Sequence, residues 1–377
     1  MRAVETRSSL LVATLAVGCA TQGAILSPKV PAVVQMEPVR FEKTEAGEIV
    51  LVDAESFFKL ANQQFSDGKY SDAIATFDKL LEAFSESKLK APALYNQGLA
   101  HEKVNQIDQA LACYRKLPDD LDALYRMGML LLKQSRFDEA AAHYERLLTR
   151  SDLTLSDHVQ AAAEQGRALF AKHDYQGAER VLRAAMSHYK DHKLEERLDN
   201  DYFLAQAAYL LGEISHAQFR LLPIRLPASQ MKQDLELKAQ MLLLAQRRYL
   251  DAMAVNHVEW AVAAGHQLGA MYREMYEAFI SAPVPPEAKG ELREIYIDEL
   301  KKKIEPLLQK AVGIFERNVL MAERIGVKSD WQQRSVAQLS ELRALLMPGA
   351  PAIQTSSAPP NPIAPDKSEP KTESRAP

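Results

Sequence analysis

Two helix-like segments joined by a short polar turn form a unit that occurs six times in this chain, once every 30 to 39 residues. A small residue, usually alanine, holds one fixed place in the second segment of each copy. A regular period of this length is typical of a helical solenoid, in which each unit packs only on its neighbours, rather than of a closed globule. The aligned positions are Ala73, Ala110, Ala140, Ala178, Ala217 and Ala252.

The first segment of each copy carries its own small residue, and this predicts how the two helices pack. Helices approach closely only where side chains are small, so we expect this residue to face the second helix. A glycine inside a helix costs about 1 kcal/mol relative to alanine, so its recurrence at one place needs a packing reason. The small residues are Ala61, Gly98, Gly128, Gly166 and Ala205; bulky residues follow at the turn (Tyr70, Ile107, Phe137, Tyr175, Ile214) and along the second segment (Phe77, Tyr114, Tyr144, Leu182, Leu221).

The composition predicts an all-α fold. Residues that favour helix dominate the 377-residue chain, and no alternating run of β-branched residues is long enough to indicate a sheet. The formal net charge is −4, whereas binding to duplex nucleic acid requires a concentrated basic face. We therefore expect no nucleic acid partner.

The repeated positions resemble the tetratricopeptide repeat, whose period is about 34 residues. The resemblance implies a right-handed helical solenoid over residues 51–226, with Pro223 and Pro227 ending the fifth copy. A degenerate sixth copy and long helices are expected over residues 227–346. The long helices are predicted at Val258–Ile280, at residues 287–325 with a kink at Pro306, and from Asp330 to near Leu346. A generic array of helical hairpins is the alternative.

The N-terminus has the features of a bacterial export signal. Two arginines precede an apolar run that is too short to span a bilayer, and the run leads to Gly18 and Cys19. The segment Leu15-Ala16-Val17-Gly18-Cys19 resembles a lipobox, with Ala16 in place of the usual leucine. This implies a signal peptide at residues 1–18, acylation of Cys19 and, because Ala20 is not aspartate, a lipid anchor on the periplasmic face of the outer membrane. An ordinary cleaved signal peptide is the alternative.

Proline-rich segments lie on either side of the repeats. Residues 19–50 contain three prolines and no helical period, which predicts an extended tether. Residues 347–377 are rich in proline, serine and charge and poor in large apolar residues, which predicts a disordered tail.

Three segments in the last third resemble the tetratricopeptide lipoproteins of bacterial adventurous gliding-motility machinery. They are residues 271–279, 282–286 and 304–308. The resemblance implies an outer-membrane lipoprotein that acts as a scaffold in a periplasmic multiprotein machine. A factor that assembles outer-membrane β-barrel proteins is one alternative, and a regulatory subunit of a cell-wall enzyme is another.

A partner groove is implied by the repeat family, in which first-helix positions two, five, nine, twelve and thirteen line a concave face. Carried over to this chain, these positions form a mostly aromatic and aliphatic strip. Aromatic residues are enriched at binding hot spots, so an apolar segment of a protein partner is the expected guest. The alternative is that the C-terminal helices fill the groove. The candidate groove residues are Phe58, Tyr95, Leu99, Tyr125, Met129, Phe170, Tyr202 and Tyr209.

The sequence contains no recognisable catalytic motif, and we expect neither enzymatic activity nor a cofactor. It has no glycine-rich phosphate loop, nucleophile elbow or zinc-protease helix motif. His188 and His192 lie four residues apart, but a zinc site requires three or four converging ligands. No metal site is therefore predicted.

Overall fold

The structure is a computed structural model that describes residues 39–43 and 49–346. Within this part, two strands precede thirteen α-helices, which confirms the all-α prediction for the repeat region. The strands are β1 (Val39–Lys43) and β2 (Ile49–Asp53). The helices are α1 (Ala54–Ser66), α2 (Tyr70–Ala83), α3 (Lys90–Lys103), α4 (Ile107–Tyr114), α5 (Leu121–Lys133), α6 (Phe137–Leu147), α7 (Leu155–Ala171), α8 (Tyr175–His192), α9 (Tyr202–Leu221), α10 (Ala228–Ala254), α11 (Val258–Ile280), α12 (Glu291–Ile325) and α13 (Asp330–Leu346).

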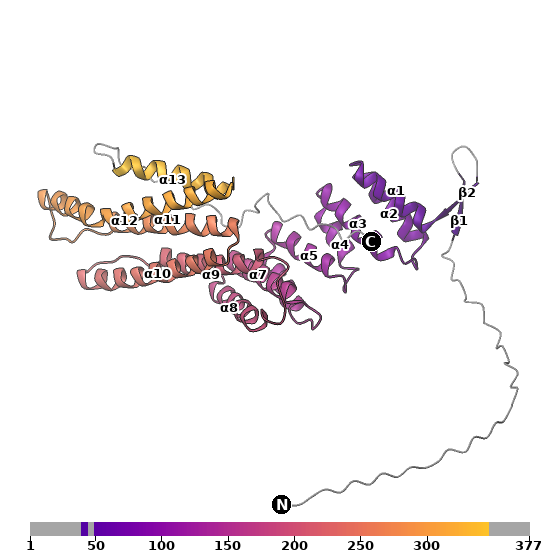
Figure 1. The fold of residues 1–377 in the computed structure, drawn as a ribbon, viewed down its shortest axis with the longest axis horizontal. Helices are drawn as coiled ribbons and strands as arrows, with labels where there is room; N and C mark the ends of the chain where they lie inside the picture. The colour runs from indigo at the N-terminus through magenta and orange to yellow at the C-terminus, as the bar shows by residue number, and fades with distance from the viewer. Residues whose placement is uncertain (1–38, 44–48, 347–377) are drawn as a thin grey trace, which may run out of the picture.

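Consecutive helices pair into hairpins, and the hairpins stack in chain order. The pairs run from α1–α2 to α11–α12, and α13 packs on α12 and α11 at the end of the array. Figure 1 shows the colour passing steadily from indigo to yellow along the stack, because each hairpin lies beside its neighbours in sequence. This is the arrangement of a helical solenoid.

The first four hairpins share one turn geometry. The turn residues Gly68, Asn105, Ser135 and His173 all have φ between 57° and 77°. In each case the next amide N–H donates to the carbonyl five residues earlier, as Gln106 does to His101 at 2.8 Å. This bond satisfies a carbonyl that the helix end would leave unpaired. The periodic short turn of the sequence is therefore one repeated backbone motif.

The contact between the two helices of a hairpin is a glycine against a bulky side chain. A Cβ at Gly98 would lie 2.6 Å from the Tyr114 ring, and added Cβ atoms at Gly128 and Gly166 would overlap Tyr144 and Leu182. The bulky residue follows its glycine by sixteen positions in each hairpin. In α1–α2 the equivalent buried pair is Ala61 and Phe77.

The same contact recurs in the two long hairpins, where it corrects the predicted register. Added Cβ atoms at Gly212 and Gly269 would meet the rings of Tyr249 and Phe315 at 2.5 and 2.7 Å. A buried alanine precedes each ring by four residues, as it does in the short hairpins. In the fifth hairpin, the small residue of the first helix that faces the second helix is thus Gly212 rather than Ala205. The second helix of this hairpin is α10. The fifth and sixth alanines of the pattern are Ala245 and Ala311, not Ala217 and Ala252.

Two predicted elements were consequently wrong. The fifth copy was expected to turn near Ile214, but Ile214 is buried within the uninterrupted helix α9. The degenerate sixth copy was expected after residue 227, but the single helix α10 (Ala228–Ala254) occupies this segment. In contrast, α11 and α13 have the predicted bounds, and α12 covers most of the predicted long helix with Pro306 inside it.

A short β-hairpin precedes the first helix and was not predicted. β1 and β2 pair antiparallel, with Val39 opposite Asp53 and Lys43 opposite Ile49. Asp53 ends β2 and also caps α1, because its side chain accepts a hydrogen bond from the Ser56 N–H at 2.7 Å. The signal peptide, Cys19, most of the tether and the C-terminal tail lie outside the described residues.

The packing of Gly128 makes a testable prediction about stability. Gly128→Ala should destabilise the chain by about 1–3 kcal/mol, because the new methyl group overlaps the buried Tyr144 ring. Gly313→Ala in α12 is the control, since its Cβ would meet only the Arg317 side chain at 3.5 Å. That substitution should instead stabilise the helix, by up to about 1 kcal/mol. Urea unfolding of both variants measures the difference, and equal midpoints would show that Gly128 is not a packing site.

Candidate functional site

The first helices of the hairpins carry the predicted groove, and a hollow lies at its N-terminal end. The hollow has a volume of about 730 Å³ and is lined by both apolar and polar side chains. Phe58 and Asn62, at repeat positions five and nine, belong to this lining. The Asn96 amide of the next first helix donates to Asn62 Oδ1 at 2.9 Å. The remaining lining residues are Glu55, Lys59, Gln63, Ser66, Lys88 and Leu89.

Between α3 and α5, the predicted groove has a polar network in which the charges are paired. Tyr114 donates to Glu102 Oε1 at 2.5 Å, and Arg126 lies 3.5 Å from the other carboxylate oxygen. Burial raises the pKa of Tyr95, although its hydrogen bond with Arg126 opposes the shift. The phenol therefore stays protonated at neutral pH. Leu99 from α3 and Met129 from α5 are half-buried, so each keeps part of its apolar surface available for contact.

Three of the predicted groove residues are buried instead of open to a partner. Tyr125, Phe170 and Tyr209 are 8%, 6% and 2% exposed. Tyr125 donates to the Asp157 carbonyl at 2.7 Å, and the Phe170 ring packs on Tyr175. Their packing roles are therefore clear, whereas a contact with a partner stays a prediction. Phe58, Tyr95, Leu99, Met129 and Tyr202 are half-buried.

The corrected register changes which residues occupy the groove positions of α9. With Gly212 in the small position, repeat position five is Tyr209, and positions nine and twelve are Glu213 and His216. Tyr202 then lies in the first turn of α9, before the first position of the repeat. Sequence reasoning missed Glu213 and His216 because it aligned Ala205 with the earlier glycines. An alignment of Gly212 with those glycines would have placed both residues at groove positions.

The C-terminal helices cover the groove position of α9. Tyr209 packs on Trp260 from α11 at a ring distance of 5.0 Å and on Trp331 from α13 at 6.3 Å. The chain thus covers this part of its own predicted groove, as one alternative proposed. The hollow beside α1 is at the opposite end of the array in chain order.

Three histidine rings stack between α7 and α8. His158 lies 3.9 Å from His188, and His188 lies 4.2 Å from His192, measured between ring centroids. His158 Nδ1 is buried without a hydrogen-bond partner in the described part of the chain. Among the described residues, no three His, Cys, Asp or Glu side chains are placed to hold a metal ion.

Comparison with known proteins identifies the repeats. A sequence model of the tetratricopeptide repeat family matches residues 58–123 and 125–189. These two stretches are similar to tetratricopeptide repeats. None of the curated proteins matches the chain. The match covers the four short hairpins, in which the spacing between the small and bulky residues is constant.

Several solved structures are similar at low sequence identity. MamA from Desulfovibrio magneticus RS-1 (from residue 41 on) is 16% identical, with a TM-score of 0.34, over 52% of this chain and 96% of that one. A tetratricopeptide repeat protein from Parabacteroides merdae is 12% identical, with a TM-score of 0.36, over 75% and 98%. The C-terminal part of a repeat protein from Cytophaga hutchinsonii is 12% identical, with a TM-score of 0.38, over 76% and 95%. These TM-scores are below 0.5, so the likenesses carry no argument about function.

Acid is expected to loosen the α7–α8 hairpin. Burial and the two neighbouring histidines lower the pKa of His158 to about 4, below its usual value of about 6.5. Between these values the unfolded chain binds a proton that the folded chain does not, so stability falls as the pH falls through this window. Thermal unfolding from about pH 7 to pH 4.5 should show this loss, and His158→Phe should reduce it while keeping an aromatic ring in the stack. His101→Phe is the control, because His101 lies on α3, where its ring bonds Gln106 at 2.7 Å. Equal pH dependence in all three proteins would contradict the assignment.

Proposed function

We propose that this chain is a lipid-anchored scaffold that holds protein partners in a bacterial envelope complex. The tetratricopeptide repeats support the general role, since such repeats are typically non-catalytic modules for binding proteins. The N-terminal lipobox-like sequence supports the anchor, and the resemblance to gliding-motility lipoproteins suggests the process. A role in β-barrel assembly or in regulating a cell-wall enzyme stays an alternative prediction.

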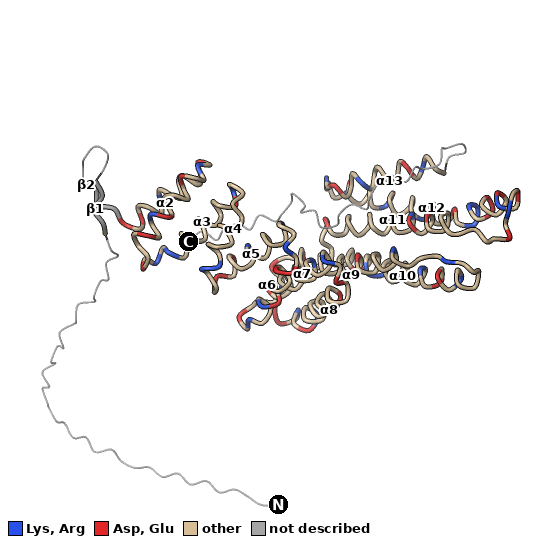
Figure 2. Tube along the Cα trace, turned by 180° about the vertical axis from the view of Figure 1, so that it is seen from behind, with Lys and Arg blue, Asp and Glu red and all other residues tan. Residues whose placement is uncertain are grey.

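The observation that carries the proposed partner site is the apolar surface left on the first helices. Leu99 and Met129 are half-buried beside a network whose charges are already paired, and a hollow opens next to Phe58. A partner segment that covers these side chains would bury apolar area without leaving a charge unpaired. Figure 2 shows acidic and basic residues interspersed along the array, so we expect shape and apolar contact to dominate the binding.

None of the helices in the described part is long and apolar enough to cross a bilayer. We propose that the chain is attached to the membrane through Cys19. Stable anchoring requires more than one acyl chain, because a single chain gives only marginal binding.

The partner site is tested by placing charges in the proposed groove. Leu99→Glu combined with Met129→Glu should weaken binding by at least about tenfold, which corresponds to about 1.4 kcal/mol, because the partner would have to desolvate two carboxylates. Affinity purification from native membranes identifies the partner, and calorimetry with the purified partner measures the dissociation constant. The control is Leu243→Glu with Leu250→Glu, which makes the same charge change at exposed positions of α10. If the groove variant and the control bind alike, the partner does not use this face.

The lipid anchor is tested at Cys19. Cys19→Ser should move the protein from the membrane fraction to the soluble fraction, because serine offers no thiol for acylation. Intact mass spectrometry of the wild-type protein should show a mature N-terminus at Cys19 that carries acyl chains. A wild-type mass without acyl chains would contradict the lipid anchor and favour an ordinary cleaved signal peptide.

A further inference from the structure

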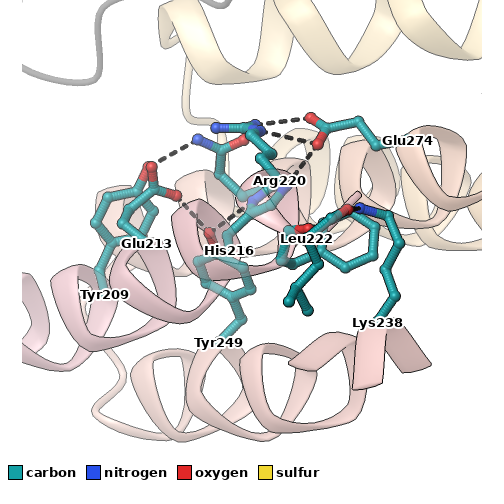
Figure 3. A network of polar contacts seen from close by, with 10 residues as sticks. Tyr209, Glu213, His216, Arg220, Leu222, Lys238, Tyr249 and Glu274 are labelled. Atoms are coloured by element: carbon teal, nitrogen blue, oxygen red, sulfur yellow. Dashed lines mark hydrogen bonds and ion pairs between the residues drawn. The ribbon is translucent and has the colours of Figure 1, made fainter. Parts of the chain in front are cut away.

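A buried network of polar side chains joins α9, α10 and α11, and the proposed partner site does not require it (Figure 3). Tyr209, Glu213 and His216 come from α9, Tyr249 from α10 and Glu274 from α11. His216 is fully buried, as is Tyr249, and Glu213 is almost so. Buried polar groups require hydrogen-bond partners, so each proton in this network can be assigned by counting donors and acceptors.

The two tyrosines both donate to Glu213. An ionised carboxylate only accepts hydrogen bonds, so the short contact between Tyr249 Oη and Glu213 Oε1 uses the single phenol proton of Tyr249. Tyr209 is also hydrogen-bonded to Glu213, and its oxygen accepts from Gln267 Nε2 at 3.2 Å. Burial raises the pKa of both tyrosines well above its usual value, with the Glu213 charge adding to the shift, which keeps both protons in place.

His216 lies between two acceptors. Its Nδ1 is 3.1 Å from Tyr249 Oη, whose proton is already given to Glu213, so the ring nitrogen must donate. Its Nε2 is 3.0 Å from Glu274 Oε2, a carboxylate oxygen that only accepts. Both ring nitrogens therefore carry hydrogen. We infer that His216 is a buried imidazolium whose proton holds α9, α10 and α11 together, so that the junction is a pH-sensitive lock.

The charges around His216 favour this state. Glu274 accepts two hydrogen bonds from Arg220, at 2.7 and 2.8 Å, so Glu213 and Glu274 face one guanidinium and one imidazolium. Burial alone would raise the pKa of Glu274, but His216 and Arg220 outweigh it and lower the value to about 2. With His216 protonated, the imidazolium and the Arg220 guanidinium supply one positive charge for each of the two carboxylates.

Two further basic groups face the junction, and neither replaces the imidazolium. Lys238 of α10 donates to the carbonyls of Phe219 and Leu222 at 2.7 and 2.9 Å. Its ammonium therefore pairs with backbone carbonyls at the C-terminal end of α9. His266 of α11 is neutral at physiological pH, because burial lowers its pKa to about 4, with the charges of Arg334 and His216 adding to the shift.

The lock also connects to the face of α9 that carries the groove positions. Tyr209 belongs to the network through its hydroxyl, while its ring packs on Trp260 of α11. Loss of the His216 proton removes a hydrogen bond from the core and unbalances its charge, so α11 separates more easily from α9 and α10. The inference concerns protonation alone and holds whether or not a partner binds the groove.

The protonation state can be measured directly in the wild-type full-length chain. The protein is labelled with ¹⁵N at the histidine rings, and His216→Gln assigns the His216 resonances by their disappearance. At about pH 7.5, both ring nitrogens of His216 are expected to carry hydrogen. One bare ring nitrogen would overturn the inference, because the extra proton would then lie on Glu213 or be absent.

The lock is tested by alkaline unfolding. An unfolded histidine loses its proton near pH 6.5, so above this pH the folded chain holds one extra proton and stability falls as the pH rises. This contribution makes the unfolding equilibrium constant rise about tenfold per pH unit until the folded ring releases its proton. His216→Gln should lack this contribution, whereas His143→Gln should keep it. His143 is a suitable control because it is buried on the Leu124 carbonyl and burial lowers its pKa.

The outcomes separate clearly. A wild-type slope that is retained in His143→Gln and lost in His216→Gln supports the lock. The same alkaline slope in all three proteins would contradict it. If His216→Gln does not fold, the wild-type ring ¹⁵N spectrum decides alone. The His216 signals are then assigned as the buried pair that shifts when Glu274→Gln replaces the carboxylate beside Nε2 with a neutral amide.

Discussion

The whole array depends on one contact, in which a glycine of the first helix lets a bulky side chain of the second helix lie against its backbone. The contact occurs at Gly98, Gly128 and Gly166 in the short hairpins and at Gly212 and Gly269 in the long ones. A glycine is unfavourable inside a helix, so it is retained here because close packing repays the cost. The recurrence of this contact gives successive hairpins a similar surface on which the next hairpin packs.

The long hairpins require further contacts, because their second helices extend well beyond the single glycine contact. At α9–α10 the extra surface is joined through buried charges, and Arg248 adds hydrogen bonds to the Leu211 carbonyl, to Ser215 and to Glu179. Buried charges are costly unless each is paired. Such pairing is directional, so it fixes the rotation of α10 and α11 about α9 more strictly than apolar contacts would.

The sequence predicted the repeated hairpins and the long helices α11 and α13, because side-chain size at fixed spacing reflects packing directly. It misplaced the fifth unit because α9 and α10 are longer than the helices of the short hairpins. Tyr249 therefore lies 37 residues after Gly212, outside the spacing that a fixed period predicts. It missed the β-hairpin because strands of five residues leave little pattern.

The groove was the least predictable part. A repeat position states which face of a helix a residue occupies, but its exposure depends on how tightly the following helices pack. Tyr95 and Tyr125 hold the same position, yet only Tyr125 is buried, where it bonds the Asp157 carbonyl of α7. Likewise, the coverage of Tyr209 depends on Trp331, which lies more than a hundred residues later in the chain.

The unequal helix lengths give the array a mechanical asymmetry. At about 1.5 Å per residue, the 14 residues of α2 span about 21 Å and the 35 residues of α12 span about 52 Å. A rotation of about 5° at the base of α12 would therefore displace its far end by about 4–5 Å, more than twice the displacement of a short hairpin. The C-terminal end therefore has a longer reach than the short hairpins, so a small change in packing at its base would move its tip through a larger distance.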